Sequence, residues 1–107
     1  MTADLKYPER AKNYANKFHR KMAKSVVATS LGQDVYTLLS IIVQTEDASR
    51  YSRRVDFWNE QLAAVAGFRS VKAMRLARDK AERAGWLHYI AGTKSTPAGY
   101  WVTEPEH

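Results

Sequence analysis

A chain of 107 residues has the size of one small domain, which argues against a second independent core. Its 45% hydrophobic content, which includes three Trp, six Tyr and three Phe, suffices for a packed interior and argues against disorder. The absence of cysteine excludes a disulfide framework, a cysteine-ligated metal and a thiol nucleophile, and it indicates a reducing, cytoplasmic setting.

The net charge of +6 is compatible with three partners: nucleic acid, an anionic membrane surface or an acidic protein. Residues 1–24 contain seven Lys or Arg against two acidic residues, and residues 69–83 contain six against two. The rest of the chain is slightly acidic, so the positive charge is confined to two segments. The apolar run Leu38–Val43 is far too short to span a bilayer, and its flanks do not resemble a signal peptide.

The first basic segment is predicted to be an amphipathic helix within residues 1–24. Apolar and aromatic residues recur there at steps of three and four, with Lys and Arg between them: Tyr7, Ala11, Tyr14, Phe18 and Met22. Pro8 suits the first turn, where its missing N–H has no partner to lose. Interfacial membrane helices share this composition, but we expect the stripe to pack on the core because a small domain needs it as cover.

The middle of the chain is predicted to contain a helix, a loop, a short strand and a second helix. Asp34–Gln44 has a wide apolar stripe that suits a central helix, with Asp34 as its N-cap. Thr45–Arg54 is polar and is predicted to be a loop. Residues 55–58 are expected to form the third strand of a sheet, and Asn59 is placed to cap a helix over Glu60–Ala66.

Gly67 ends that helix where left-handed backbone is needed, and Ser70 suits the N-cap of a helix over residues 70–84. Two short helices joined by a short turn that contains Gly are the signature of a helix-turn-helix. Beyond Gly85, residues 86–90 and 100–103 are rich in aromatic and β-branched residues. This composition predicts a β-hairpin with its tip at 91–99.

The helix at 70–84 is expected to have two distinct faces. The residues spaced to pack on the core are Met74, Ala77, Ala81 and Ala84. The opposite face then presents Lys72, Arg75, Leu76, Asp79 and Lys80. Val71 and Arg78 lie at the borders between the two faces.

Three stretches carry a resemblance to a known family: Asn59-Glu60-Gln61-Leu62-Ala63, then Gly67 with Ser70, then Ala81-Glu82-Arg83-Ala84-Gly85-Trp86-Leu87. The segment Trp58–Val102, which contains them, resembles the winged helix-turn-helix domains of bacterial transcription regulators and of phage or plasmid replication proteins. Ala81 and Arg78 depart from this family, in which large aliphatic residues are usual at those positions. The resemblance implies one α+β domain over 1–107, mainly α with a small β-sheet. The domain is expected to contain a winged-helix core (34–103) with three helices and a β-hairpin wing, together with a basic N-terminal helix (1–24) that the minimal family lacks.

In that family the second helix of the turn enters the major groove of DNA. The resemblance therefore places Lys94 on the wing at 91–99. The residues that it places toward the groove are Ser70, Val71, Lys72, Arg75, Leu76 and Asp79. Arg and Lys pair with guanine edges or phosphates, and hydroxyls and helix N-termini bind phosphate. The best candidates for phosphate contacts are Arg69 and Ser70, for base edges Lys72 and Arg75, and for further backbone contacts Arg53 and Arg54.

The sequence thus predicts non-catalytic binding of double-stranded DNA in transcription regulation or replication, with helix 70–84 in the major groove. The turn, the wing and the N-terminal helix are expected to contact phosphates. If five to eight phosphates are neutralised, the logarithm of affinity falls with that of salt with a slope of about −4 to −7. A homodimer is left open, because two-fold dimers often read paired half-sites. Neither a membrane nor a small-molecule substrate is expected as a partner.

Two alternatives remain open. In one, the basic residues of helix 70–84 are only its solvated face, offset by Arg75–Asp79 and Arg78–Glu82 pairs. In the other, the winged helix is a protein-interaction or dimerisation module that does not bind DNA. Its binding surface is then the N-terminal helix, the aromatic hairpin, the extended edge Tyr100–Thr103 or the acidic Glu46-Asp47.

An enzyme is not predicted. His19, His88 and His107 lie on different elements, without a second ligand at metal spacing. No Gly-rich phosphate loop or nucleophile elbow is found in the sequence. The remaining acidic residues are expected to be caps and solvated surface: Asp34, Glu46, Asp47, Asp56 and Glu60. We therefore expect no catalytic residue, no metal and no cofactor.

Overall fold

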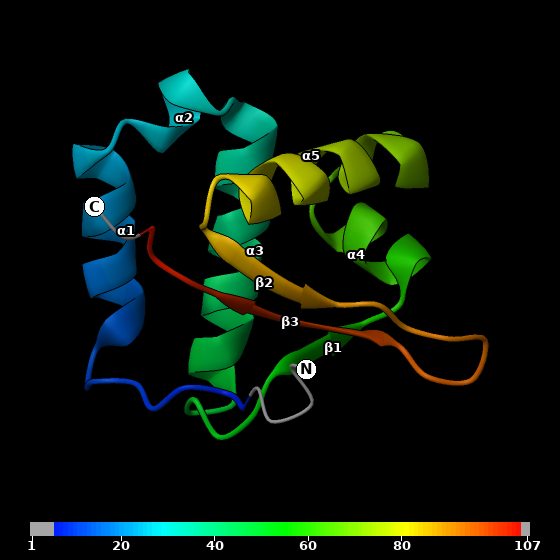
Figure 1. Ribbon diagram of the computed structural model, residues 1–107, viewed down its shortest axis with the longest axis horizontal. Coiled ribbons are helices and arrows are strands. Elements are labelled where there is room, and N and C mark those ends of the chain that lie inside the picture. Colours follow the sequence, from blue (N-terminus) through cyan, green and yellow to red (C-terminus); the bar gives the residue numbers. More distant parts are fainter. Residues whose placement is uncertain (1–5, 106–107) are drawn as a thin grey trace.

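The long helix α3 (Gln33–Ala48) lies at the centre of the fold, and the other elements pack around it. The computed structural model describes residues 6–105. Five apolar residues of α3 are buried along one stripe, as the sequence predicts: Val35, Leu38, Leu39, Ile42 and Val43. Figure 1 shows α1 (Tyr14–Lys24) and α2 (Val27–Ser30) on one side of α3. α5 (Val71–Arg83) crosses α3 and extends to the other side, where α4 (Asn59–Val65) lies.

Three short strands form one antiparallel sheet in the order β1-β3-β2. β1 (Val55–Phe57) and β2 (Leu87–Ile90) flank β3 (Ala98–Val102), with Tyr100 opposite both Val55 and Tyr89. With five helices in residues 6–105, the fold is α+β, and the predicted hairpin and third strand are confirmed. The expectation that Tyr100–Thr103 is a free edge is wrong, because β3 is the central strand and pairs on both sides.

The N-terminal helix is shorter than the sequence predicts. α1 begins at Tyr14, after Asn13, whose backbone is left-handed with a φ of 64°. Residues 6–12 are not helical, so Pro8 does not lie in a first helical turn. The prediction that the stripe packs on the core is confirmed within α1. Phe18 and Met22 are fully buried, and the Phe18 ring packs against Trp86 with 5.7 Å between centroids.

Contacts with Glu46 explain why residues 6–12 are not helical. Its fully buried carboxylate accepts hydrogen bonds from Tyr7 Oη at 2.6 Å, Arg10 Nη2 at 2.8 Å and the N–H of Val102 at 2.8 Å. Arg10 also donates to the carbonyl of Val102 at 2.7 Å and lies 4.2 Å from the centroid of the Tyr14 ring. Burial, followed by the bond to Glu46, raises the pKa of Tyr7. The predicted surface position of Glu46 is therefore wrong, and so is the predicted loop from Thr45, because α3 continues to Ala48.

Two predicted helix caps are also wrong. Gly32, with a φ of 102°, precedes α3, and Asp34 lies in the first turn instead. At the start of α4 the N–H of Trp58 donates to Gln61 Oε1 at 3.2 Å. Asn59 is already within α4, and its side-chain oxygen accepts a hydrogen bond from Arg78.

Membrane insertion finds no support in the helices. Among residues 6–105, none combines the length and the apolar character that a bilayer span requires. The apolar side of α1 is turned toward α3 and is covered by the core. It therefore presents no free apolar face of the kind that interfacial helices use.

Candidate nucleic-acid interface

The turn between α4 and α5 forms as the sequence predicts. Gly67 has a φ of 80°, and the N–H of Phe68 donates to the carbonyl of Ala63 at 2.8 Å, which closes the end of α4. Ser70 caps α5, since its Oγ accepts the N–H of Ala73 at 3.1 Å. The hydroxyl proton of Ser70 remains a donor, and the first N–H groups of α5 lie beside it. Together with the exposed Arg69, they make the start of α5 suited to an anion.

The outward face of α5 is also as predicted. Its exposed residues are Lys72, Arg75, Leu76, Asp79 and Lys80. Met74, Ala77 and Ala81 are buried on the opposite side. In the described part of the chain none of the ion pairs involves α5, so the Arg75–Asp79 and Arg78–Glu82 pairs of the solvated-face alternative do not form. Val71 is half-buried at the border.

Arg78 is not at the border of the outward face, as the sequence suggests, but in the core. It is 5% exposed, and its guanidinium lies 4.0 Å from the centroid of the Tyr89 ring. Its Nη1 donates to Asn59 Oδ1 at 3.2 Å and to Tyr100 Oη at 3.1 Å. Burial raises the pKa of Tyr100, although the bond from Arg78 opposes this shift. Arg78 thus links α5 to α4 and to the central strand.

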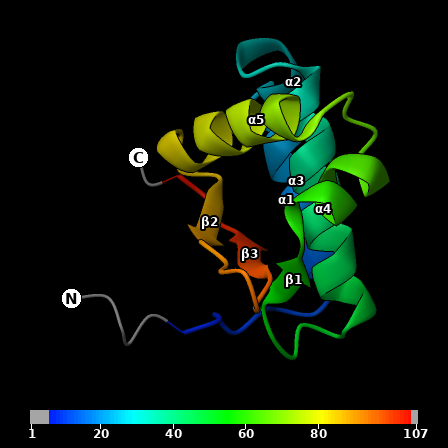
Figure 2. The ribbon, with the colours of Figure 1, turned by 90° about the vertical axis from the view of Figure 1, so that its right-hand side faces the viewer.

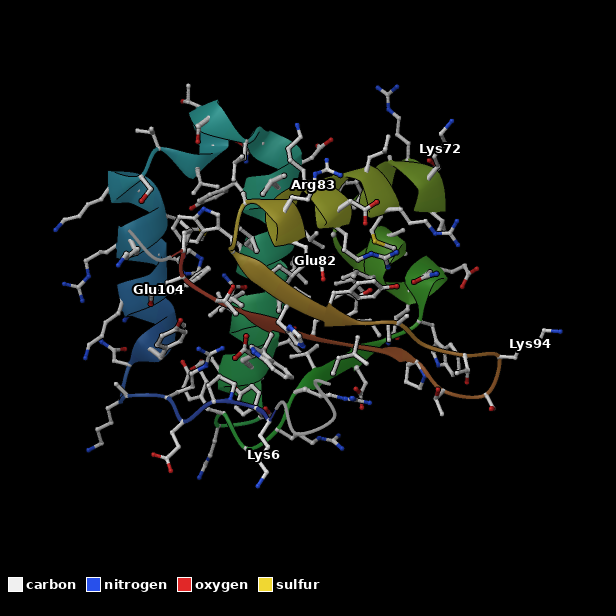
Figure 3. The ribbon with its side chains drawn as sticks, viewed as in Figure 1. Lys6, Lys72, Glu82, Arg83, Lys94 and Glu104 are labelled. Atoms are coloured by element: carbon white, nitrogen blue, oxygen red, sulfur yellow. The ribbon has the colours of Figure 1, made fainter. Side chains whose placement is uncertain are left out.

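The wing is a compact turn that exposes one positive charge. Thr93 Oγ1 accepts the N–H groups of Ser95 and Thr96 at 3.2 and 3.1 Å. A Cβ on Gly92 would lie 2.6 Å from the carbonyl of Thr96, so only glycine fits there. Figure 3 shows Lys94 at the wing tip and Lys72 near the start of α5, both on the same side of the molecule. Figure 2 views this side face-on.

An exposed tryptophan lies between the wing and α4, and sequence reasoning did not single it out. Trp58 is 43% exposed and lines a groove of about 270 Å³ with Asn59, Glu60, Tyr89 and Lys94 among its walls. Strand alternation carries the signal, because Val55 and Phe57 point into the core and leave the next residue outside. The groove places an aromatic ring and a lysine side by side.

Arg53 and Arg54 are not brought together with the outward face of α5. Arg54 Nε pairs with Asp56 Oδ1 at 2.9 Å, and the side chain of Arg54 lies over Gly99. Arg53 is exposed next to a groove of about 380 Å³ that Ile90 and Trp101 also line, on the outer face of the sheet. α5 packs with β2 on the inner side, where the core lies.

The two basic segments do not form one continuous face. α1 packs against α2 and α3, whereas the start of α5 and the wing lie beyond α3. In Figure 2, which faces α5 and the wing, α1 lies behind α3. The expectation that the N-terminal helix adds phosphate contacts to the same surface therefore lacks the required geometry.

The two described histidines, His19 and His88, are not part of a metal site among residues 6–105. His19 Nδ1 lies 2.9 Å from the carbonyl of Ala15, and the ring of His88 packs 4.4 Å from that of Trp101. Burial lowers the pKa of His88. Among residues 6–105, no three His, Asp or Glu side chains gather closely enough to hold a metal ion. His107 lies outside the described residues.

No protein-family model matches the chain, and comparisons with curated proteins and with solved structures give no match either. What the chain does is therefore inferred from the geometry of its own residues.

Proposed function

We propose that this chain is a winged helix-turn-helix domain that binds double-stranded DNA and catalyses no reaction. In this proposal α5 enters the major groove, and the wing lies near the DNA backbone. The observation that supports it best is the outward face of α5, where Lys72 and Arg75 are exposed and form no ion pair with another described residue. The major groove of B-DNA, about 12 Å wide, admits a helix. The order helix, strand, helix, turn, helix, hairpin also supports the winged-helix assignment.

The position of each residue suggests its role. Lys72 and Arg75 are the candidates for base edges, because they extend from the exposed face of α5 in its first two turns. Arg69 and Ser70 sit at the helix start and are the candidates for phosphate contacts. Lys94 is the candidate for a backbone contact from the wing. Such a domain serves in transcription regulation or replication, as a monomer or a homodimer.

Fluorescence anisotropy with short duplexes tests this proposal. Arg75→Gln is expected to change the preference between sequences, because one lost base contact costs about 1–3 kcal/mol at that position only. Arg69→Gln is expected to weaken binding to all duplex sequences alike, since a phosphate contact carries no sequence information.

Arg83→Gln is the matched control, because it removes the same charge from an exposed position at the far end of α5. It should leave sequence preference unchanged. Unchanged affinity in the double variant Lys72→Gln with Arg75→Gln, in a protein that still folds, would overturn the proposal.

One observation favours the alternative of a protein-interaction module. Leu76 is 62% exposed and borders a groove of about 430 Å³ between α5 and the start of α3, which Leu31 and Val35 also line. A partner helix with apolar anchors suits such a groove. Mass that rises with concentration in light scattering, without retention on duplex DNA, would support this alternative, and Leu76→Lys should then abolish the association.

A further inference from the structure

The outward side of α1 is a second basic surface, separate from the one that contains Lys72. Lys17, Arg20 and Lys24 are spaced by three and four residues, so they share one side of the helix, and all three are exposed. α1 contains no acidic residue. Lys21, at the border of this side, pairs with Glu104 at 3.1 Å, whereas the other three form no ion pair within residues 6–105.

This surface is held rigidly by the core. Phe18 and Met22 fix α1 against α3 from the inner side. The N–H of Ala15 donates to Tyr51 Oη at 2.9 Å, and Tyr14 Oη donates to Glu104 at 3.2 Å. Figure 3 shows side chains tipped with nitrogen along the outer side of α1, pointing away from the body of the molecule. The three cations are therefore presented together on a fixed scaffold.

The position of α1 excludes it from a duplex bound by α5. α1 and the α5 and wing surface lie on opposite sides of α3, in a body of 37 × 31 × 28 Å. DNA has a persistence length of about 150 base pairs, so a short duplex does not wrap around a body of this size. A partner on α1 is then a separate molecule.

We propose that the outward side of α1, with Lys17, Arg20 and Lys24, binds the phosphate backbone of a second DNA duplex, so that one chain bridges two duplexes. This proposal rests on the proposed function, which assigns the first duplex to α5. Charge complementarity favours DNA, because closely spaced cations match a polyanion and release its counterions. Lysine acts as a point charge that suits phosphate. A lipid surface is disfavoured, because the apolar side of α1 is buried.

A two-duplex capture assay tests the proposal. One duplex is fixed to beads, the protein is added at low salt, and a second, fluorescent duplex follows after washing. Wild-type protein is expected to retain the second duplex. The triple variant Lys17→Gln/Arg20→Gln/Lys24→Gln should bind the first duplex with an affinity within about twofold of the wild type. Its capture of the second duplex should fall at least about tenfold. The salt slope of that capture step should be smaller by about 3.

A charge-conserving triple variant, Lys17→Arg/Arg20→Lys/Lys24→Arg, is the matched control and should retain capture.

Three results would overturn the inference. The first is wild-type protein that binds the first duplex but never the second. The second is capture that survives the Gln variant, as a dimer would produce. The third is equal loss of both duplexes in the Gln variant. Binding to vesicles of anionic lipid without capture of a second duplex would identify lipid headgroups as the occupant instead. If the Lys72→Gln/Arg75→Gln variant binds the first duplex as tightly as the wild type does, the proposed function alone has failed.

Discussion

Glu46 is a buried charge whose contacts with Tyr7 and Arg10 hold the segment before α1 against the core. The Arg10 and Glu46 side chains are 6% and 0% exposed, and 2.8 Å separates Arg10 Nη2 from Glu46 Oε1. The two carboxylate oxygens also accept Tyr7 Oη and the N–H of Val102. A buried ion pair adds little to the free energy of unfolding compared with an apolar pair of the same shape. Loss of one partner, however, leaves the other charge buried without compensation.

Replacing Arg10 by Met is therefore expected to lower the free energy of unfolding by about 3–5 kcal/mol, because Glu46 stays buried without its cation. Urea denaturation at pH 7 measures this. Lys12→Met, two residues along and exposed, is the control and should change stability by less than about 0.5 kcal/mol. The double replacement of Arg10 and Glu46 by Met should cost less than the sum of the single ones. Strict additivity would contradict the coupling.

His88 is expected to make stability depend on pH between neutrality and mild acid. Burial against Trp101 lowers its pKa below the ordinary 6.5. As pH falls through 6.5 the unfolded chain therefore takes up a proton before the folded chain does, and stability falls until the folded pKa is passed. Urea denaturation at pH 7.5 and 5.5 should show this fall, and His88→Gln should reduce it. A fall in His88→Gln identical to that of the wild type would contradict the assignment.

Single residues show where sequence reasoning ends. Glu46 follows Val43 at helical spacing, so its place on the buried stripe of α3 could be predicted from the sequence. Arg10, the cation that pairs with Glu46, lies 36 residues away in the chain. The burial of Arg78 likewise depends on Asn59 and Tyr100, at separations of 19 and 22 residues. No local pattern indicates such partners. A charged residue without a visible partner is expected near the surface. For this reason the predicted surface position of Glu46 and the predicted border position of Arg78 were wrong, although the family resemblance marks position 78 as a core position.

At the scale of elements, the start of α5 depends on its cap. Ser70 has an extended backbone that Ala and Gly can also adopt, and its hydroxyl accepts the N–H of Ala73. Ser70→Ala is expected to lower the free energy of unfolding by about 1 kcal/mol. Ser70→Gly should lower it by only about a few tenths of a kcal/mol, because glycine leaves the N–H groups at the helix start open to water. Thermal and urea unfolding of both variants measure the difference. Equal costs would show that the cap does not stabilise α5.

The turn, α5 and the hairpin, whose ends depend on neighbouring residues, were predicted correctly, whereas the N-caps of α3 and α4 were not. Gly67, Ser70 and Gly85 act within a few residues, so the turn, α5 and the hairpin follow from sequence. The start of α1 and the end of α3 depend on contacts of Tyr7, Arg10 and Glu46 across the fold. The same distinction applies to the candidate interface: helical periodicity predicts the exposed face of α5, whereas Trp58 joins the groove beside the wing only through tertiary packing.

At the scale of the whole molecule, charge counts located the two basic segments but not their relative position. Whether they face one partner or two depends on how α1 and α5 pack around α3, which no periodicity encodes. The structure separates them, and it also pairs Arg54 with Asp56 on the sheet. Fewer cations therefore face a duplex on α5 than the five to eight phosphate contacts expected from sequence require.

This separation sets the salt dependence of binding to a single short duplex. Lys80, on the outward face of α5, donates to the carbonyl of Leu31 at 3.3 Å. Apart from Lys80, four exposed cations lie at the start of α5, along its outward face and on the wing: Arg69, Lys72, Arg75 and Lys94. We expect a slope of log affinity against log salt no steeper than about −3.6, because four neutralised phosphates at most would contribute about 0.9 each. Anisotropy titrations between about 50 and 200 mM salt, with dilute duplex so that bridging is suppressed, measure it.

Arg75→Gln should make that slope shallower by about 0.9 if Arg75 also neutralises a phosphate, and by less if it contacts only a base edge. The triple Gln variant of Lys17, Arg20 and Lys24 should leave it unchanged, because α1 faces away from this duplex. A slope of about −6 or steeper that the triple variant reduces would mean that α1 contacts the same duplex. The assignment of four cations to one face and the proposal of a second duplex on α1 would then both be wrong, while DNA binding through α5 would stand.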